Sequence, residues 1–210
     1  IPLRLVGSEM CIRDREDVEP GTWIESGKRE RLVCFANGLV DLADPARKVR
    51  RHSADFFGLS SLPFDFMGVG VLETSVKVPC PNWLEFLNSV WPDSPESVAL
   101  LQEFCGYVVS GRTDLQKGLL ITGPTRSGKG TIRGVLEGLV GAENVVSPTL
   151  AGLTTQFGLA SLMGRTLAMV GDAQIVTDRR GSAAVAEKLK SMIGEDPQLI
   201  CLLYTSPSPR

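Results

Sequence analysis

Short apolar runs alternate with amphipathic segments in the second half of the chain. In order, these runs and segments are 118–122, 130–140, 144–146, 154–163, 166–170 and 182–193. We interpret the runs as buried strands and the segments as helices. Strands that alternate with helices are typical of a parallel sheet with helical crossovers. The pattern therefore predicts an α/β core over residues 113–200.

Two further helices are expected ahead of this core. Apolar side chains recur at helical spacing from Trp83 to Val90 and from Val98 to Val108. Ser94 can cap the second helix, and Pro95 fits its first turn. Because each helix carries one apolar stripe to bury, we predict a small helical subdomain at 79–112, docked against the core.

Residues 16–78 are interpreted as an irregular or β-rich lead-in segment. Arg31–Ala36 and Leu39–Leu42 flank Asn37-Gly38, a dipeptide that favours a hairpin turn. A basic cluster follows, made of Arg47, Lys48, Arg50 and Arg51. This cluster is either a solvated charged face or a contact for a nucleic-acid backbone.

The composition fits an ordinary soluble globular protein, with 43% hydrophobic and 22% charged residues among 210. The net charge of −2 does not require a nucleic-acid partner, but a local basic surface stays compatible with one. No apolar run approaches the roughly 20 residues of a membrane span. The five cysteines show no metal-ligand spacing and no paired framework, which favours reduced, cytoplasmic thiols.

Both ends of the chain differ from the sequence beside them. Residues 1–15 and 201–210 resemble translated sequencing-adaptor read-through, so we leave them out of the fold prediction. A signal peptide describes the first segment poorly, because its apolar run is short and is broken by Arg4. We therefore expect the natural protein to be longer on both sides.

A glycine-framed loop between the run 118–122 and the following helix predicts a site for nucleotide phosphates. Its backbone N–H groups and the helix N-terminus favour an anion, and a lysine places a charge at the β and γ phosphates. The expected binding residues are Gly123, Pro124, Thr125, Arg126, Ser127, Gly128, Lys129, Gly130 and Thr131.

The loop departs from the usual pattern at one position. Gly130 stands where a Ser or Thr normally follows the lysine, and Thr131 comes one residue later. Either the Thr131 hydroxyl reaches Mg²⁺, directly or through water, or another group holds the metal.

Asp172 is the second candidate for catalysis. It ends the apolar run Thr166–Val170 after Gly171, and chemistry gathers at the carboxyl ends of parallel strands. A carboxylate there can hold Mg²⁺ or its water shell, or orient the attacking water. We therefore expect Lys129 and Asp172 to be the catalytic residues.

Three motifs resemble a known family. GPTRSGKGT, TLAMVGDAQ and EKLKSMIGEDPQ, in that order, look like the first three motifs of superfamily 3 helicases, closest to phage and plasmid primase–helicases. FANGLVDL, CPNWLEFL and LLQEFCGYVVSG resemble the family's lead-in, so the resemblance covers residues 33–200.

The resemblance implies an AAA+-type P-loop ATPase that assembles as a homo-oligomeric ring, commonly a hexamer. It would use ATP and Mg²⁺ to translocate on single-stranded DNA in the cytoplasm of a bacterial host. Lys129 would bind the β and γ phosphates, Thr131 would assist at the metal, and Asp172 would be the acid of the second motif. Lys190 lies in the third motif, which leads toward a DNA-contacting hairpin; the alternative is a solvated lysine.

Several parts of the family pattern are not found in this sequence. Neither a polar sensor residue nor an arginine that reaches a neighbour's γ-phosphate can be identified, and no primase module precedes residue 16. We therefore expect the core to be incomplete. This polypeptide should bind nucleotide poorly and unwind nothing, although its parent gene encodes a motor.

Two other functions stay open. A nucleotide-switched replication initiator or loader would need only one acid at Asp172, which has Gly171 and Ala173 as neighbours. A nucleoside monophosphate kinase would share the Gly-Lys-Gly-Thr run. That class places the loop near its N-terminus, however, and lacks the later motifs.

Overall fold

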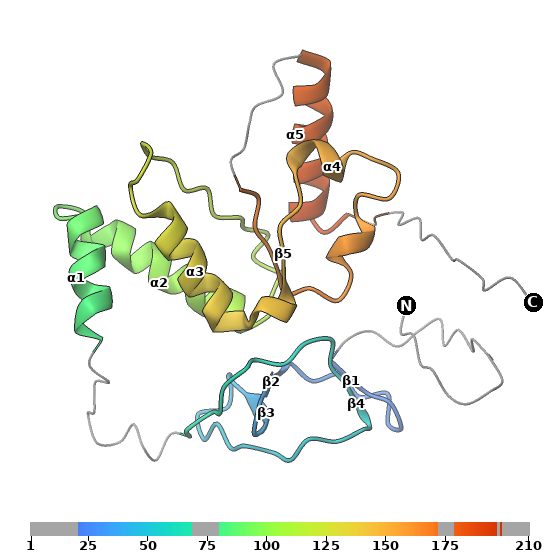
Figure 1. The fold of residues 1–210 in the computed structure, drawn as a ribbon. Coiled ribbons are helices and arrows are strands. Elements are labelled where there is room, and N and C mark those ends of the chain that lie inside the picture. Colours follow the sequence, from blue (N-terminus) through green and yellow to red (C-terminus); the bar gives the residue numbers. More distant parts are fainter. Residues whose placement is uncertain (1–20, 69–79, 172–178, 197, 199–210) are drawn as a thin grey trace, which may run out of the picture. The chain divides into compact units, whose positions relative to one another are not determined.

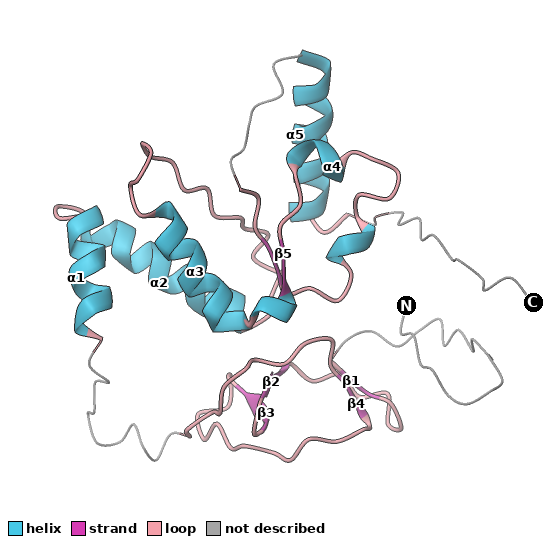
Figure 2. Ribbon diagram, viewed as in Figure 1, coloured by secondary structure: helices cyan, strands magenta, loops and turns pink. Residues whose placement is uncertain are grey.

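The computed structural model describes residues 21–68, 80–171, 179–196 and 198. These residues fall into two compact units, Ile1–Val76 and Lys77–Arg210, which are described separately (Figure 1). The first unit contains strands and loops, and the second contains every described helix together with one pair of short strands (Figure 2).

The first unit is built from two antiparallel strand pairs. β1 (Thr22–Trp23) pairs with β4 (Phe56–Phe57), and β2 (Leu32–Phe35) pairs with β3 (Gly38–Asp41). Its buried core is apolar and consists of Phe35, Leu39, Val40, Phe56 and Leu62. The β-rich character expected for this segment is therefore seen in its described part.

The predicted hairpin is confirmed, but its turn lies one residue earlier than expected. Phe35 pairs with Gly38, so the two-residue loop is Ala36-Asn37 rather than Asn37-Gly38. A Cβ at Gly38 would lie 2.2 Å from the Arg50 carbonyl oxygen, so glycine is needed for this close approach. The Asn37 side chain instead donates to the Phe66 carbonyl at 3.0 Å and accepts from the Phe66 N–H at 2.9 Å. Asn37 thus fastens the 64–66 segment to the hairpin.

The second unit begins with the two expected helices, α1 (Pro81–Val90) and α2 (Pro95–Val109). Ser94 occupies the N-cap position of α2, but its hydroxyl bonds the Ser97 hydroxyl at 2.8 Å rather than a backbone N–H. The helix ends at Val109 with Ser110 as its C-cap residue, and Gly111 follows with φ of +62°.

The next elements follow the predicted strand–helix order. They are α3 (Lys129–Val140), the 3₁₀ turn η2 (Ala142–Asn144), β5 (Val145–Val146), α4 (Leu150–Leu153), the 3₁₀ turn η3 (Ala160–Leu162), β6 (Leu167–Ala168) and α5 (Arg179–Ile193). β5 and β6 pair in parallel, with Val145 opposite Leu167. The wider parallel sheet of a P-loop NTPase stays a prediction.

The core of this unit lies between α1, α2 and α3. Leu87, Leu101, Ile132 and Leu136 are buried there. Leu119, Ile121, Leu167 and Met169 pack against this cluster, so the run before the loop and the strand β6 reach the same core as the helices. The boundary predicted at 112 stays a prediction.

Two predicted elements are wrong. The run 118–122 is not a strand: Leu119 and Ile121 face the core and Leu120 is 81% exposed, but no β-ladder forms along the run in the described residues. The segment 154–163 is not one helix. Thr154 and Thr155 turn their hydroxyls back to the carbonyls of Ala151 and Gly152, which favours the turns seen there.

The described cysteines Cys34, Cys80 and Cys105 are free thiols. Partial burial raises the pKa of the Cys34 and Cys105 thiols, which favours their protonated form. Among the helices in the described part of the chain, none has both the length and the apolar character needed to cross a bilayer. Both segments suspected to be foreign, 1–15 and 201–210, lie outside the described residues.

Candidate nucleotide-binding site

The predicted phosphate loop leads directly into α3. Arg126 and Gly128 have φ of +64° and +84°, both in the left-handed region, and Gly128 is the N-cap residue of the helix. A Cβ at Gly128 would lie 2.8 Å from Cζ of Phe86, so both the angle and the packing require glycine. The left-handed residues Arg126 and Gly128 thus turn the loop at two points, and the chain then continues into the first turn of α3.

The Lys129 ammonium lies within this loop. It donates to the carbonyl oxygens of Gly123 at 2.9 Å and Pro124 at 2.7 Å, and to the Ser127 hydroxyl at 3.2 Å. These three bonds match the three donors of an ammonium group. The positive charge is therefore held at the N-terminus of α3, where the helix dipole already favours an anion.

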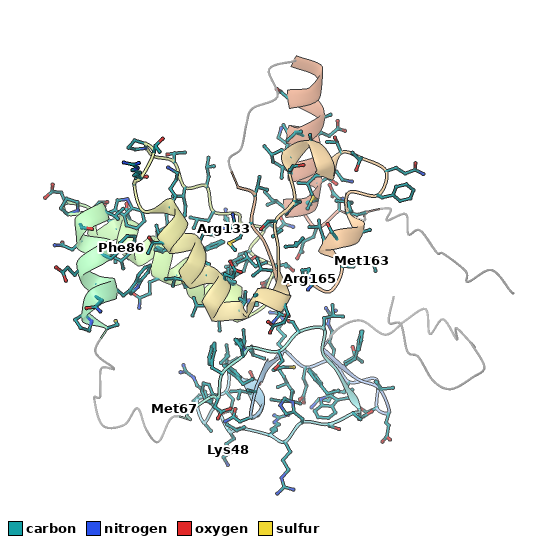
Figure 3. The ribbon with its side chains drawn as sticks, viewed as in Figure 1. Lys48, Met67, Phe86, Arg133, Met163 and Arg165 are labelled. Carbon is teal, nitrogen blue, oxygen red and sulfur yellow. The ribbon has the colours of Figure 1, made fainter. Side chains whose placement is uncertain are left out.

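A cavity of about 590 Å³ lies beside the loop, on the side of α1. From α1 it is lined by Phe86, Ser89 and Val90, and from the loop and α3 by Arg126, Ser127, Gly128, Gly130 and Thr131. Phe86 is labelled in Figure 3, on α1. The structure thus brings five of the nine predicted binding residues to one cavity and places Lys129 beside it.

Thr131 is exposed and lines the cavity, in the first turn of α3. Its backbone N–H donates to the Gly128 carbonyl at 3.0 Å, and its hydroxyl is on the exposed side chain. A hydroxyl oxygen is a donor that Mg²⁺ accepts alongside phosphate oxygens and water. Thr131 therefore suits the metal role, although it is displaced by one position.

Arg133 is a candidate that the sequence reasoning missed. It follows Lys129 by one turn of α3, and its Nη2 donates to the Ser147 hydroxyl at 2.7 Å, just after β5. Its Nη1 lies 3.8 Å from the place a Cβ would take at Gly171, after β6. Arg133, labelled in Figure 3, thus bonds the segment after β5 and lies near Gly171, which follows β6. The i, i+4 spacing from Lys129 was the available signal.

The other predicted site residues are placed less fully. Asp172 lies outside the described residues, although its neighbour Gly171 ends the segment near Arg133. Lys190 lies on the last turn of α5 with an exposed side chain, and α5 packs against α4. In the described ranges, no group of three His, Cys, Asp or Glu side chains is arranged to hold a metal ion.

Comparisons with known proteins place this site in context. Residues 17–92 match a family described as D5 N terminal like, and residues 121–204 match a family of unknown function, DUF5906. The D5 N-terminal domain is the N-terminal region of phage and plasmid primase–helicase proteins. The match supports that family. The candidate loop, residues 123–131, lies wholly inside the second matched region.

A relative is also found among curated proteins. The chain is 26% identical over 133 residues to the uncharacterized mitochondrial protein ymf21 of Marchantia polymorpha. This alignment covers 60% of the present chain and 72% of the Marchantia protein. No solved structure matches the chain. The primase–helicase relationship therefore depends on the family match in the N-terminal part, and the site on its own geometry.

Proposed function

We propose that this chain is part of an ATP-dependent DNA helicase in a phage or plasmid replication protein of the primase–helicase type. The observation that carries the proposal is the Lys129 ammonium, held within a glycine loop at the start of α3. The D5 N-terminal match supports the replication context. Hydrolysis of ATP would drive translocation along single-stranded DNA.

The loop residues bind the phosphates in this proposal. Backbone N–H groups between Thr125 and Gly130 and the dipole of α3 hold the anion, and Lys129 exchanges loop carbonyls for the β and γ phosphate oxygens. Thr131 and Asp172 would hold Mg²⁺, which neutralises charge on the transferred phosphoryl group. Asp172 would hold the metal, orient the attacking water, or do both.

Other parts of the proposal concern assembly and DNA. The ring would be homo-oligomeric, with a hexamer as the expected form, and it would work in the cytoplasm of a bacterial host. Exposed Lys190 is the candidate DNA contact on α5. A positive side chain on an exposed helix face can neutralise a backbone phosphate.

One alternative keeps the nucleotide site but removes the motor. The acid at Asp172 has Gly171 and Ala173 as neighbours, whereas motors of this kind often have two adjacent acids. A replication initiator or loader would bind ATP to govern its assembly and would hydrolyse it slowly.

Stimulation of ATP hydrolysis by single-stranded DNA tests the proposal in the full-length gene product. We expect single-stranded DNA to raise the hydrolysis rate severalfold or more, and Lys129→Ala to abolish both the basal and the stimulated rate. A rate that single-stranded DNA leaves unchanged would favour the initiator or loader instead. Full activity in Lys129→Ala would remove the loop from the mechanism.

A further inference from the structure

The cavity beside the phosphate loop has a second wall whose chemistry differs from that of the loop. Phe86 and Val90 of α1 form an apolar side, and Ser89 lies between them in sequence. Trp83 stacks on Phe86 with the ring centroids 5.4 Å apart and the planes inclined by 21°. Phe86 is therefore backed by a second aromatic ring, which fixes its orientation.

The two walls belong to one cavity. Phe86 reaches the loop directly, because a Cβ at Gly128 would meet its ring at 2.8 Å. The cavity volume of about 590 Å³ falls within the range of small-molecule sites, which combine apolar walls with a few polar groups. Phosphates held by the loop would leave the rest of a bound nucleotide beside α1.

We propose that Phe86 and Val90 form the seat for the base of the nucleotide, with Phe86 as its stacking surface. This inference rests on the proposed nucleotide-binding function of the loop. Every base has a π-face, so stacking on an aromatic side chain strengthens binding without discriminating between bases. The ligand class is thus a nucleoside triphosphate, bound by its base as well as by its phosphates.

The affinities of the full-length gene product for ATP and for tripolyphosphate separate the contributions of the two walls to binding. Tripolyphosphate has the anionic chain of ATP but no base, so only the loop should hold it. We expect wild type to bind ATP about tenfold or more tightly than tripolyphosphate. We expect Phe86→Leu to reduce that preference by about tenfold and to leave tripolyphosphate affinity unchanged.

Two variants complete the design. Phe86→Leu keeps an apolar side chain and is the main variant, because Phe86→Ala risks unfolding a helix that packs on the core. Leu84→Ala is the matched control, since Leu84 is on the same helix, is 56% exposed and does not line the cavity. The control should bind both ligands as wild type does.

Three outcomes would contradict either the base seat or the proposed nucleotide-binding function. Equal weakening of ATP and tripolyphosphate in Phe86→Leu would mean that Phe86 only shapes the loop, which overturns the base seat. No change for either ligand in Phe86→Leu, with both weakened in Lys129→Ala, overturns the base seat and leaves the proposed function standing. No change for either ligand in Lys129→Ala refutes the proposed function itself.

Discussion

At the scale of single residues, the site depends on one glycine whose conformation and surroundings both exclude a side chain. Gly128 has φ of +84° and lies against Phe86. A left-handed conformation costs a non-glycine residue about 1–2 kcal/mol, before any clash is counted. A side chain at position 128 would therefore be expected to distort the loop.

Gly128→Ala should lower the free energy of unfolding by about 1–2 kcal/mol or more and should weaken ATP binding. Urea denaturation and ATP titration of the full-length gene product measure the two effects. Gly134→Ala is the control, because a Cβ there meets nothing within 4 Å and alanine favours a helix interior by up to about 1 kcal/mol. A Gly128→Ala protein as stable as wild type would show that the loop adopts another conformation.

Glu30 gives the first unit a pH dependence. Lys28 is the largest cause that lowers its pKa from 4.5 to about 2, followed by hydrogen bonds from Trp23 and Arg50. The Trp23 indole donates at 3.1 Å and Arg50 at 2.7 Å. Because the folded form has the lower pKa, the stabilisation is complete above pH 4.5 and is lost as the pH falls toward 2.

Glu30→Gln should remove this contribution. The unfolding free energy of wild type should fall more steeply than that of the variant between pH 4.5 and 2, when unfolding is followed by tryptophan fluorescence. Glu25→Gln removes an exposed carboxylate from the same unit and serves as the charge-matched control. Parallel pH profiles for wild type and Glu30→Gln would contradict the role given to Glu30.

At the scale of elements, α3 connects the loop to the hydrophobic core. Its first residue is Lys129, and Ile132, one turn further on, is 1% exposed in the cluster with Leu87 and Leu101. Ile132 lies on the same side of α3 as Lys129, so its burial anchors the first turn of the helix and with it the lysine. Arg133 adds a hydrogen bond from the same helix to Ser147, just after β5.

Ile132→Ala should destabilise the second unit by about 2–5 kcal/mol, because it removes a buried side chain and leaves a cavity. Leu100→Ala is the control on α2, where Leu100 is 57% exposed and should cost well under 1 kcal/mol. Chemical denaturation of both variants measures the difference. Similar losses in the two variants would place the core elsewhere.

The elements also show what the sequence could and could not predict. Helices α1, α2, α3 and α5 were predicted from their amphipathic spacing, and Ser94 and Pro95 also marked the start of α2. The run 118–122 has strand periodicity, but a strand also needs a partner for its backbone groups, and that partner is not contained in the run itself. At 154–163 the expected helix does not form. The hydroxyls of Thr154 and Thr155 donate to the Ala151 and Gly152 carbonyls, which favours turns over a continuous helix.

The site was predictable to a similar extent. Glycine spacing and the lysine identify the loop, because they reflect local backbone geometry. The sequence predicts Phe86 only as a core residue. Its contact with Gly128 joins positions 42 residues apart in the chain, which helical spacing alone does not reveal. Arg133 needed the positions of β5 and β6, which only the folded chain supplies.

At the scale of the whole molecule, the two family matches cover different parts of the chain, and the first crosses from the first unit into the second. The D5 N-terminal match begins at residue 17 and reaches α1, whereas the DUF5906 match begins at residue 121 and includes α3, β5, β6 and α5. The nucleotide chemistry proposed here is confined to the second unit.

The most direct test of this account is the affinity of the full-length gene product for ATP, measured by calorimetric titration with and without Lys129→Ala. The variant should bind ATP at least about tenfold more weakly than wild type, because a charge-assisted contact to the phosphates is lost. Lys117→Ala, which removes an exposed lysine shortly before the loop, should leave the affinity unchanged. Equal ATP affinity in wild type and Lys129→Ala would contradict the claim that this loop binds nucleotide phosphates.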